Sequence, residues 1–339
     1  MGKKQIIWLI VAILLFLLTG WIGVNSAISL NQTKAETSGS LMEMLENLIY
    51  GSASNEPSTF SYPEEDFIAL VRIEGTIEAS SGDSYLYSGG GYDHGYVISY
   101  INSLIPVSSN KGILLYIDSP GGTLAESDEL YLTLMDYREY TGRPVYAYCQ
   151  NACSGAYYAA MAADHICVNR NGVFVNIGVY ISTYDMSALF EKIGVETVTI
   201  KSGENKGIGI LGNPWTDEQK EIYQSMIDES FEQFLGVVAD GRGWDIGELR
   251  QKVDGREMSA QQALRDGYVD QIDRFDAYLD AVLSDTGCEW YVDPPRPSGL
   301  PFDLSSFLSS LFPRSESQIL LDFAKNHDGI KVMAYAENH

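Results

Sequence analysis

The sequence predicts an α/β protein with a mostly parallel β-sheet, on the strength of three observations. Short apolar runs alternate with segments of helical length between residues 67 and 200. Two of these runs end in small residues that lead directly into a helical pattern, as at a strand-to-helix turn. The 339 residues are 45% apolar, which is enough for a buried core. Strands separated by helical crossovers pair in parallel.

The first half of the predicted domain supplies three strands. Residues 67–73 (FIALVRI) form a nearly unbroken apolar run, which is typical of a buried strand. Residues 113–117 (ILLYI) and 145–148 (VYAY) have the same character. Segments of helical pattern at 96–104 and 123–140 connect them.

The second half continues the alternation. The predicted elements are a helix at 154–163, a strand at 165–168, a helix at 186–193 (MSALFEKI), a strand at 196–200 and a long amphipathic helix at 216–238. Asp217 and Glu218 lie in the first turn of that last helix, where the helix dipole favours acidic side chains. Regular order weakens after residue 276, so one domain over residues 66–285 accounts for every element.

The N-terminal region contains a predicted membrane span. Residues 6–24 are 19 residues without a charge, and at 1.5 Å per residue they reach ~28 Å, close to the hydrocarbon thickness of a bilayer. Lys3 and Lys4 precede the run, so the positive-inside rule places the N-terminus in the cytoplasm and the remaining chain outside, as a single-pass protein of the cell membrane. A cleaved signal peptide is the competing interpretation, but its apolar core is usually shorter.

Four segments follow from this division. Residues 1–26 are a cytoplasmic tip and anchor, residues 27–65 a polar linker, residues 66–285 the domain and residues 286–339 an extension with a Pro-rich connector. Small and apolar residues alternate at 332–336 (VMAYA), and we expect this segment to lie in a cleft as a pseudo-substrate.

Charge and cysteine content exclude several classes of function. A net charge of −24 argues against binding to nucleic acid, which requires clustered Lys and Arg. The four cysteines include no Cys-x-x-Cys pair, so we expect no metal site and no cofactor. Cys149 and Cys153 are interpreted as small buried residues, with a disulfide between them as the alternative.

Ser154 is the candidate nucleophile. It lies at the turn between a predicted strand and a predicted helix, beside a glycine. Backbone N–H groups at such a turn, unobstructed by Cβ atoms, suit acyl transfer. The competing interpretation is a serine that only caps the helix.

A serine hydroxyl needs a base to remove its proton. None of the four histidines (His94, His165, His327 and His339) forms an obvious triad with Ser154 in the sequence. Lys206 is the other candidate, because it follows a predicted strand among glycines and isoleucines whose burial would keep its amine neutral. Two solvated lysines on a loop, Lys201 and Lys206, are the alternative.

Several short sequence blocks favour the catalytic interpretation of Ser154 and Lys206 over these alternatives. They are DSPGG from residue 118, ACSGAYY from 152, AADHI from 162, IGV from 177, KSGENK from 201 and DGR from 254. In order and spacing they resemble the signal peptide peptidase A family of membrane-anchored serine peptidases. The resemblance covers residues 66–275 and the N-terminal anchor.

The resemblance implies a ClpP/crotonase-like βαβ superhelical fold and a Ser-Lys dyad. It assigns the nucleophile to Ser154, the general base to Lys206 and the oxyanion hole to the backbone amides of Gly121 and Gly155. It also implies an endopeptidase that cleaves membrane-derived peptides such as remnant signal peptides, and a homo-oligomeric ring whose subunits share the active-site cleft.

The chain departs from the family pattern at two positions. Asn176 replaces a serine whose hydroxyl helps to hold the lysine amine, and an amide oxygen can accept the same hydrogen bond; a bare turn is the alternative role. Gly207 replaces an aspartate that commonly follows the lysine.

Two other functions are compatible with the sequence. The departures at Asn176 and Gly207 favour a catalytically inactive, membrane-tethered binding or scaffolding protein. An acyl-CoA enzyme of the same broad fold is disfavoured, because the domain is expected outside the cytoplasm.

Overall fold

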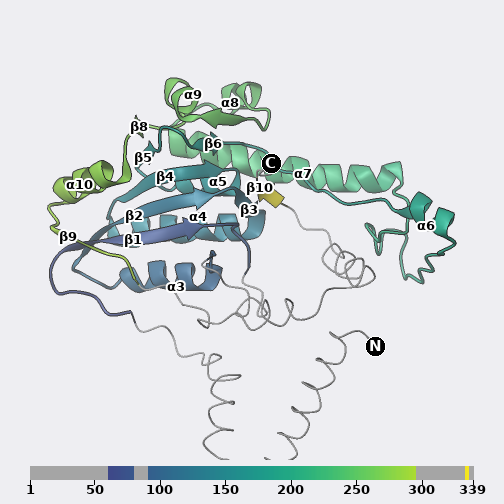
Figure 1. Ribbon diagram of the computed structural model, residues 1–339, viewed down its shortest axis with the longest axis horizontal. Helices are drawn as coiled ribbons and strands as arrows, with labels where there is room; N and C mark the ends of the chain where they lie inside the picture. Colours follow the sequence, from purple (N-terminus) through teal and green to yellow (C-terminus); the bar gives the residue numbers. More distant parts are fainter. Residues whose placement is uncertain (1–59, 80–90, 295–332, 336–339) are drawn as a thin grey trace, which may run out of the picture. The chain divides into compact units, whose positions relative to one another are not determined.

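A mostly parallel sheet forms the centre of the protein. The computed structural model describes residues 60–79, 91–294 and 333–335. Its eight-stranded sheet contains β1 (Phe67–Glu74), β2 (Asn110–Ser119), β4 (Val145–Cys153), β5 (His165–Val168), β6 (Val173–Val175), β7 (Glu257–Ser259), β8 (Gln271–Ile272) and β9 (Trp290–Val292). The strand order is β7-β6-β4-β2-β1-β9, with β5 between β4 and β8, and only the β6–β7 pair is antiparallel (Figure 1). The predicted α/β class is therefore confirmed.

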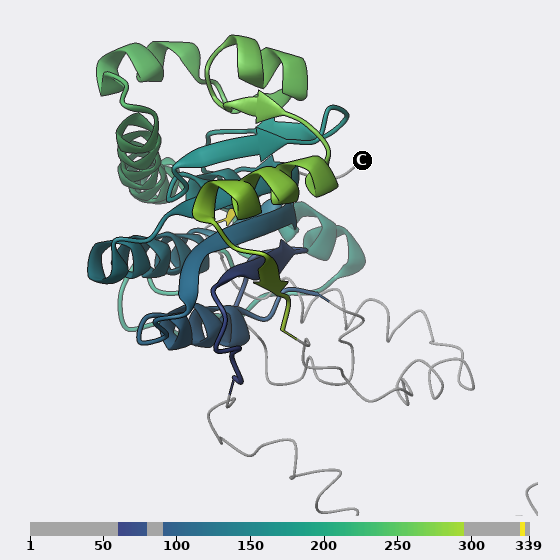
Figure 2. The same cartoon turned by 90° about the vertical axis from the view of Figure 1, so that its left-hand side faces the viewer.

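Helices cover both faces of this sheet (Figure 2). Their bounds are α3 (His94–Leu104), α4 (Leu124–Thr141), α5 (Gly155–Ala160), α6 (Ser187–Ile193), α7 (Asp217–Arg242), α8 (Ile246–Lys252), α9 (Ala260–Arg265) and α10 (Phe275–Thr286). Successive residues of β1 alternate between the faces, because side chains of a strand point to opposite sides. Phe67 and Ala69 join the core with α3, α4, α5 and the end of α7, whereas Ile68 and Leu70 pack with α10.

Two predicted features are wrong. Residues 196–200 form no strand, and Val198 and Ile200 are 77% and 97% exposed. The apolar pattern indicated burial, but the described residues of the same chain provide no surface against them. Order also persists beyond residue 276, because Tyr278, Leu279 and Val282 recur at helical spacing and bury one face of α10 against the sheet.

Several expectations fall on the ends of the chain. The predicted span at residues 6–24 and most of the linker lie outside the described residues. Within the described ranges, no helix has both the length and the apolarity to cross a bilayer. All four cysteines are buried and unpaired, so the alternative of a Cys149–Cys153 disulfide is not realised.

A second, two-stranded sheet lies beside the first. Its strands are β3 (Gly121–Thr123) and β10 (Met333–Tyr335), which pair antiparallel with Ala334 opposite Gly122. Ile77 pairs with Gly122 on the other side of β3. A three-residue strand such as β3 is too short to show a period in the sequence.

Helix α7 extends beyond the sheet. Its buried residues all lie near its C-terminal end, at Phe234, Leu235, Val238 and Ala239. Its N-terminal part continues past the sheet toward α6 (Figure 1). We call residues 179–233 the arm: an extended stretch at 179–186, helix α6, a loop at 194–216 and the exposed part of α7.

Asp270 ties the end of α7 to β5. Its carboxylate accepts hydrogen bonds from the Ile166 N–H at 2.8 Å and from the Arg242 guanidinium at 2.6 and 3.1 Å. Burial raises the pKa of Asp270, but the hydrogen bonds from Arg242 and Ile166 outweigh it, so the pKa is lowered overall. A lowered folded-state pKa contributes stability above the unfolded value, and this contribution is lost as the pH falls.

We expect Asp270→Asn to lower the free energy of unfolding by about 1.5–3 kcal/mol at pH 7, because a charge-assisted pair is lost. The deficit should shrink below about pH 4, where the wild-type carboxylate also becomes protonated. Denaturant unfolding at both pH values measures this. Asp266→Asn, in an exposed pair with Arg265, is the matched control and should change little. Equal stability of Asp270→Asn and wild type at pH 7 would refute the assignment.

Candidate active site

Ser154 occupies a strained turn between β4 and α5. Its φ is 51° and its ψ −119°. It is one of three non-glycine residues with positive φ in the described part of the chain, together with Val175 and Asn176. Such a conformation costs of order 1–3 kcal/mol and persists only where the surroundings enforce it. A strained strand-to-helix turn also carries the nucleophilic serine of α/β-hydrolases.

Two backbone hydrogen bonds enforce this turn. The Ser154 N–H donates to the Val175 carbonyl at 2.7 Å, and the Ser154 carbonyl accepts from the Tyr158 N–H at 2.9 Å. The first bond joins β4 to the end of β6, and the second opens α5. The hydroxyl is therefore held at a fixed point between two elements.

The Ser154 hydroxyl itself has no partner among the described residues. The residue is 1% exposed, and Oγ makes no hydrogen bond. Leaving a hydroxyl buried and unpaired costs about 1–3 kcal/mol. A buried polar group of this kind calls for a functional explanation.

The two predicted oxyanion glycines lie on elements that pack together. Gly121 begins β3 with φ +100°, a value that favours glycine, and β3 packs against α5. Gly155 is the first residue of α5, so its N–H belongs to the turn whose N–H groups have no partner within the helix. Both glycines are buried.

Sequence reasoning missed Ser119. Its hydroxyl accepts a hydrogen bond from the Gly121 N–H at 3.1 Å. This is a serine turn, in which a side-chain oxygen binds the amide two residues on. The signal was present in the DSPGG block, because Ser two residues before Gly is typical of that turn.

Asn176 follows β6 directly and adjoins the carbonyl that holds Ser154. Its φ is 56°, and its Nδ2 donates to the Gly255 carbonyl at 2.6 Å. The bond fixes the amide plane and leaves Oδ1 as an acceptor. The residue therefore forms a turn, and it also presents the oxygen that was expected to hold the lysine amine.

The structure does not bring Lys206 to Ser154 within one chain. Lys206 is exposed, in a turn where its N–H donates to the Gly203 carbonyl at 3.1 Å. The expected burial among Ile208 and Ile210 is absent, because these residues are themselves only partly buried. Helix α6, which directly precedes the loop that contains Lys206, lies beyond the end of α7 and away from α5 (Figure 1).

The thiol of Cys153 and the described histidines are the other candidate nucleophiles and bases. Burial and the charge of Glu257 raise the pKa of the Cys153 thiol to about 12, so this neighbour stays protonated at neutral pH. His94 bonds to Tyr92 and Glu129, and His165 bonds to Tyr278. His327 and His339 lie outside the described residues. No group of three metal-ligating side chains occurs in the described ranges.

An extended segment of the chain pairs with β3, the strand that contains Gly121. In the β3–β10 pair, Tyr335 is opposite Gly121 and Met333 is opposite Thr123. The C-terminal segment that was expected to lie in a cleft therefore pairs, at the level of the backbone, with the strand that carries a predicted oxyanion residue.

Comparison with known proteins identifies a peptidase family. Residues 138–286 match the family described as Peptidase family S49. This region contains Ser154, Gly155, Asn176 and Lys206, whereas Gly121 precedes it.

Three relatives illustrate the similarity. A protein named "Putative signal peptide peptidase SppA" from Enterococcus faecium is 29% identical over 284 residues, which are 83% of this chain and 81% of the relative. A protein named "Putative protease slr0021" from Synechocystis is 36% identical over 160 residues, 47% of this chain and 57% of the relative. "Protease 4" of Haemophilus influenzae is 25% identical over 238 residues, 67% of this chain but 38% of the relative. The aligned region thus spans most of the first relative and only part of the other two.

Gly122 tests the placement of β3. A Cβ at this position would lie 1.8 Å from the Ile77 carbonyl oxygen, so β3 would have to shift. We expect Gly122→Ala to lower the free energy of unfolding by about 1–3 kcal/mol, as overpacking does.

Gly236→Ala in α7 is the matched control, because its Cβ would meet nothing within 4 Å. It should raise the free energy of unfolding by up to about 1 kcal/mol, since alanine is the better helix former. Chemical denaturation measures both. A Gly122→Ala variant as stable as wild type would show that β3 does not approach Ile77 so closely.

Proposed function

The chain belongs to the signal peptide peptidase A family, peptidase family S49, and we propose that it is a serine endopeptidase in which Ser154 is the nucleophile and Lys206 of a neighbouring copy is the general base. The observation that carries this proposal is the Ser154 hydroxyl: buried, unpartnered and held on a strained turn. A hydroxyl with only a capping role would be bonded to its own helix, and this one is not.

Catalysis would follow the chemistry of acyl transfer. The neutral amine of Lys206 takes the Ser154 hydroxyl proton as Oγ attacks the peptide carbonyl. The lysine then donates that proton to the leaving amine, which departs with the C-terminal product and leaves an acyl-enzyme. Water, deprotonated by the same amine, hydrolyses the ester and regenerates Ser154.

The oxyanion of the tetrahedral intermediate would be bound by the N–H groups of Gly155 and Gly121. The Gly121 N–H donates to Ser119 Oγ at 3.1 Å in this structure, so that bond would be exchanged for the oxyanion. Losing one such donor costs about 3 kcal/mol in comparable sites. Ser119 would thus position the amide in the resting enzyme.

A neighbouring copy is the proposed source of the base because the described residues of one chain place no base at Ser154. Lys206 is exposed on the arm, whereas the buried Ser154 hydroxyl has no hydrogen-bond partner in the part of the chain that the structure describes. Entry of the amine into the site of another copy would remove it from water and favour its neutral form. Asn176 Oδ1 would accept a hydrogen bond from the amine, and Gly207 stands where the family commonly has an aspartate that would stabilise the charged form. We therefore propose a homo-oligomer, arranged as a ring.

The proposed substrates are extended peptides derived from membranes, including remnants of signal peptides. Such a peptide would add to β3 as an antiparallel strand, in the place that β10 occupies here. Residues 333–335 would then act as a pseudo-substrate. The proposal requires neither a metal nor a cofactor.

The remaining features of the proposal concern architecture and location. We propose a ClpP/crotonase-like arrangement of the domain at residues 66–285, followed by the extension at 286–339. Residues 1–26 would be a cytoplasmic tip and a single transmembrane anchor, joined through a linker at 27–65. The domain would then lie outside the cytoplasm, next to peptides released in the membrane.

An inactive scaffolding protein is the second candidate. The exposure of Lys206, which leaves the Ser154 hydroxyl without a hydrogen-bond partner among the described residues, is the observation that favours it. Reaction with a fluorophosphonate separates the two functions, because only an activated serine is labelled.

Complementation between two inactive variants tests the shared site. Ser154→Ala should abolish fluorophosphonate labelling and peptidase activity, and Lys206→Ala should reduce both more than a hundredfold. Lys201→Ala, on the same loop, is the matched control and should remain active. Mixed and reassembled, the two inactive variants should recover about one quarter of wild-type activity, since one interface in four pairs an intact serine with an intact lysine.

Either of two results would contradict this scheme. Undiminished labelling of Ser154→Ala would show that Ser154 is not the nucleophile. Full inactivity of the mixture, with each oligomer intact, would place the base elsewhere than on a neighbouring copy.

Deleting residues 330–339 tests the role of β10. If β10 covers the substrate strand, the deletion should lower KM for a peptide substrate severalfold with little change in kcat, because a competing segment is removed. Steady-state kinetics of the full chain and the deletion variant decide this. An unchanged KM would show that β10 does not compete with substrate.

A further inference from the structure

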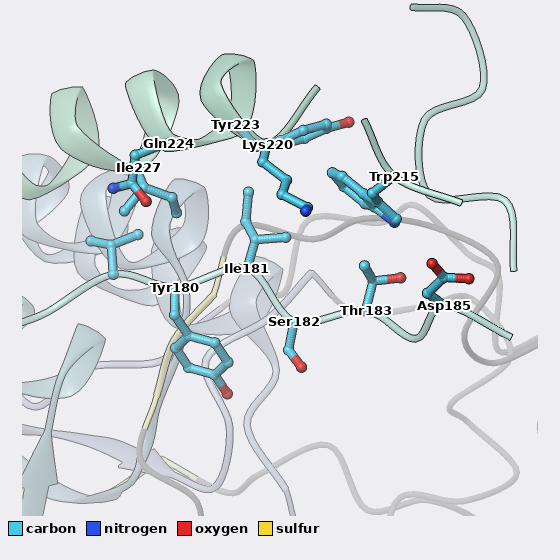
Figure 3. Close-up of a pocket in the computed structure, with 11 residues that line it drawn as sticks. Tyr180, Ile181, Ser182, Thr183, Asp185, Trp215, Lys220, Tyr223, Gln224 and Ile227 are labelled. Carbon is cyan, nitrogen blue, oxygen red and sulfur yellow. The ribbon is translucent and has the colours of Figure 1, made fainter. Parts of the chain in front are cut away.

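The arm contains a pocket of about 640 Å³ between its extended stretch and the N-terminal part of α7 (Figure 3). Residues of the extended stretch form one wall and residues of α7 the other, with Trp215 at one end. The principal lining residues are Val179, Ile181, Thr183, Trp215, Lys220 and Ile227. None of them has a role in the catalytic scheme above.

The pocket is suited to aliphatic side chains. Val179, Ile181 and Ile227 supply its apolar surface, and the Trp215 ring packs against Tyr223 with centroids 5.3 Å apart. Figure 3 shows Lys220 reaching from α7 into the space between Ile181 and Trp215. Its ammonium group is paired with Asp217 at 3.0 Å, so its methylene stem is free to line the pocket.

The same arm exposes an apolar run without a partner in the described part of the chain. Val195, Val198 and Ile200 are 48%, 77% and 97% exposed, and α6 has no buried residue. Single exposed aliphatic residues are ordinary, but a run of them on one loop marks an interaction surface.

We infer that the arm pocket of one copy receives Val198 and Ile200 of a second copy. The inference rests on the proposed function, because it names the contact that would bring Lys206 to the neighbouring Ser154. Lys206 lies six residues after Ile200, a reach of at most ~20 Å. Val179 lies four residues after Val175, whose carbonyl binds the Ser154 N–H, a path of ~13 Å. A loop anchored in the pocket can therefore reach the serine.

Charge favours the same occupant. Residues 217–232 of α7 contain six carboxylates and one lysine. The loop that carries the apolar run contains Lys201 and Lys206 together with Glu196 and Glu204, so it is neutral overall. In a chain with a net charge of −24, this loop is a segment that another copy's α7 would not repel. An acidic substrate peptide has no such advantage.

Cross-linking between copies tests the contact directly. Ile200→Cys and Thr183→Cys are placed in separate, differently tagged full-length chains, which are mixed in detergent and treated with a short bis-maleimide. The four native cysteines are buried and should react slowly. We expect a mixed dimer carrying both tags, at least tenfold more abundant than with Tyr140→Cys, which is 70% exposed at the end of α4. A yield no higher than that of the Tyr140 control would overturn the inference.

A second pair of variants measures the consequence. Ile200→Asp should reduce the oligomer mass in sedimentation and lower fluorophosphonate labelling of Ser154 at least tenfold. Leu132→Asp, which changes a 51% exposed residue on α4, should alter neither. Wild-type mass and labelling in Ile200→Asp would also overturn the inference.

The remaining outcomes separate the alternatives. A Thr183→Trp variant that raises KM while the oligomer stays intact would assign the pocket to substrate and refute docking of a second copy. Persistent labelling in Ser154→Ala would refute the proposed peptidase mechanism. The cross-link tests the contact at the pocket independently of which residue is the nucleophile.

Discussion

The hydrogen bond from the Ser154 N–H to the Val175 carbonyl is the contact on which the candidate site depends. It joins the end of β4 to the end of β6 at 2.7 Å, and the residues at both of its ends have positive φ. Positive φ has a high conformational free-energy cost for a β-branched residue such as Val175. The surrounding sheet offsets this cost and holds Ser154 at the start of α5, which packs against β3. The strain is thus concentrated where chemistry is proposed.

The arm carries the proposed base, Lys206, apart from the buried Ser154 in the described part of one chain. The strands and α5 fix the proposed nucleophile and the predicted oxyanion amides inside a close-packed core, whereas Lys206 lies on the exposed loop between α6 and α7. Separating the two groups would keep the monomer inactive and make peptide cleavage conditional on assembly. The exposed apolar run and the arm pocket give that assembly a physical basis.

The sequence predicted the parts of the structure that are encoded locally. Continuous apolar runs identified β1, β2 and β4, and the turn chemistry after β4 identified Ser154 as the candidate nucleophile. It failed where burial is decided by distant contacts. Residues 196–200 carry the pattern of a strand, yet Ile200 is 97% exposed because the described residues of its own chain do not cover it. Strands of three residues, such as β3, are too short to show a period. The bond between Ser119 and the Gly121 N–H was readable as a serine turn but carried no signal of its role.

The distance between Lys206 Nζ of one copy and Ser154 Oγ of its neighbour, measured in a cryo-electron microscopy structure of the assembled full chain, decides whether one copy supplies the base to the next. We expect the two atoms to lie within about 3.2 Å of each other across the interface, with the amine enclosed by protein. An assembled structure in which every Lys206 amine stays in solvent, far from any Ser154 hydroxyl, would contradict this expectation.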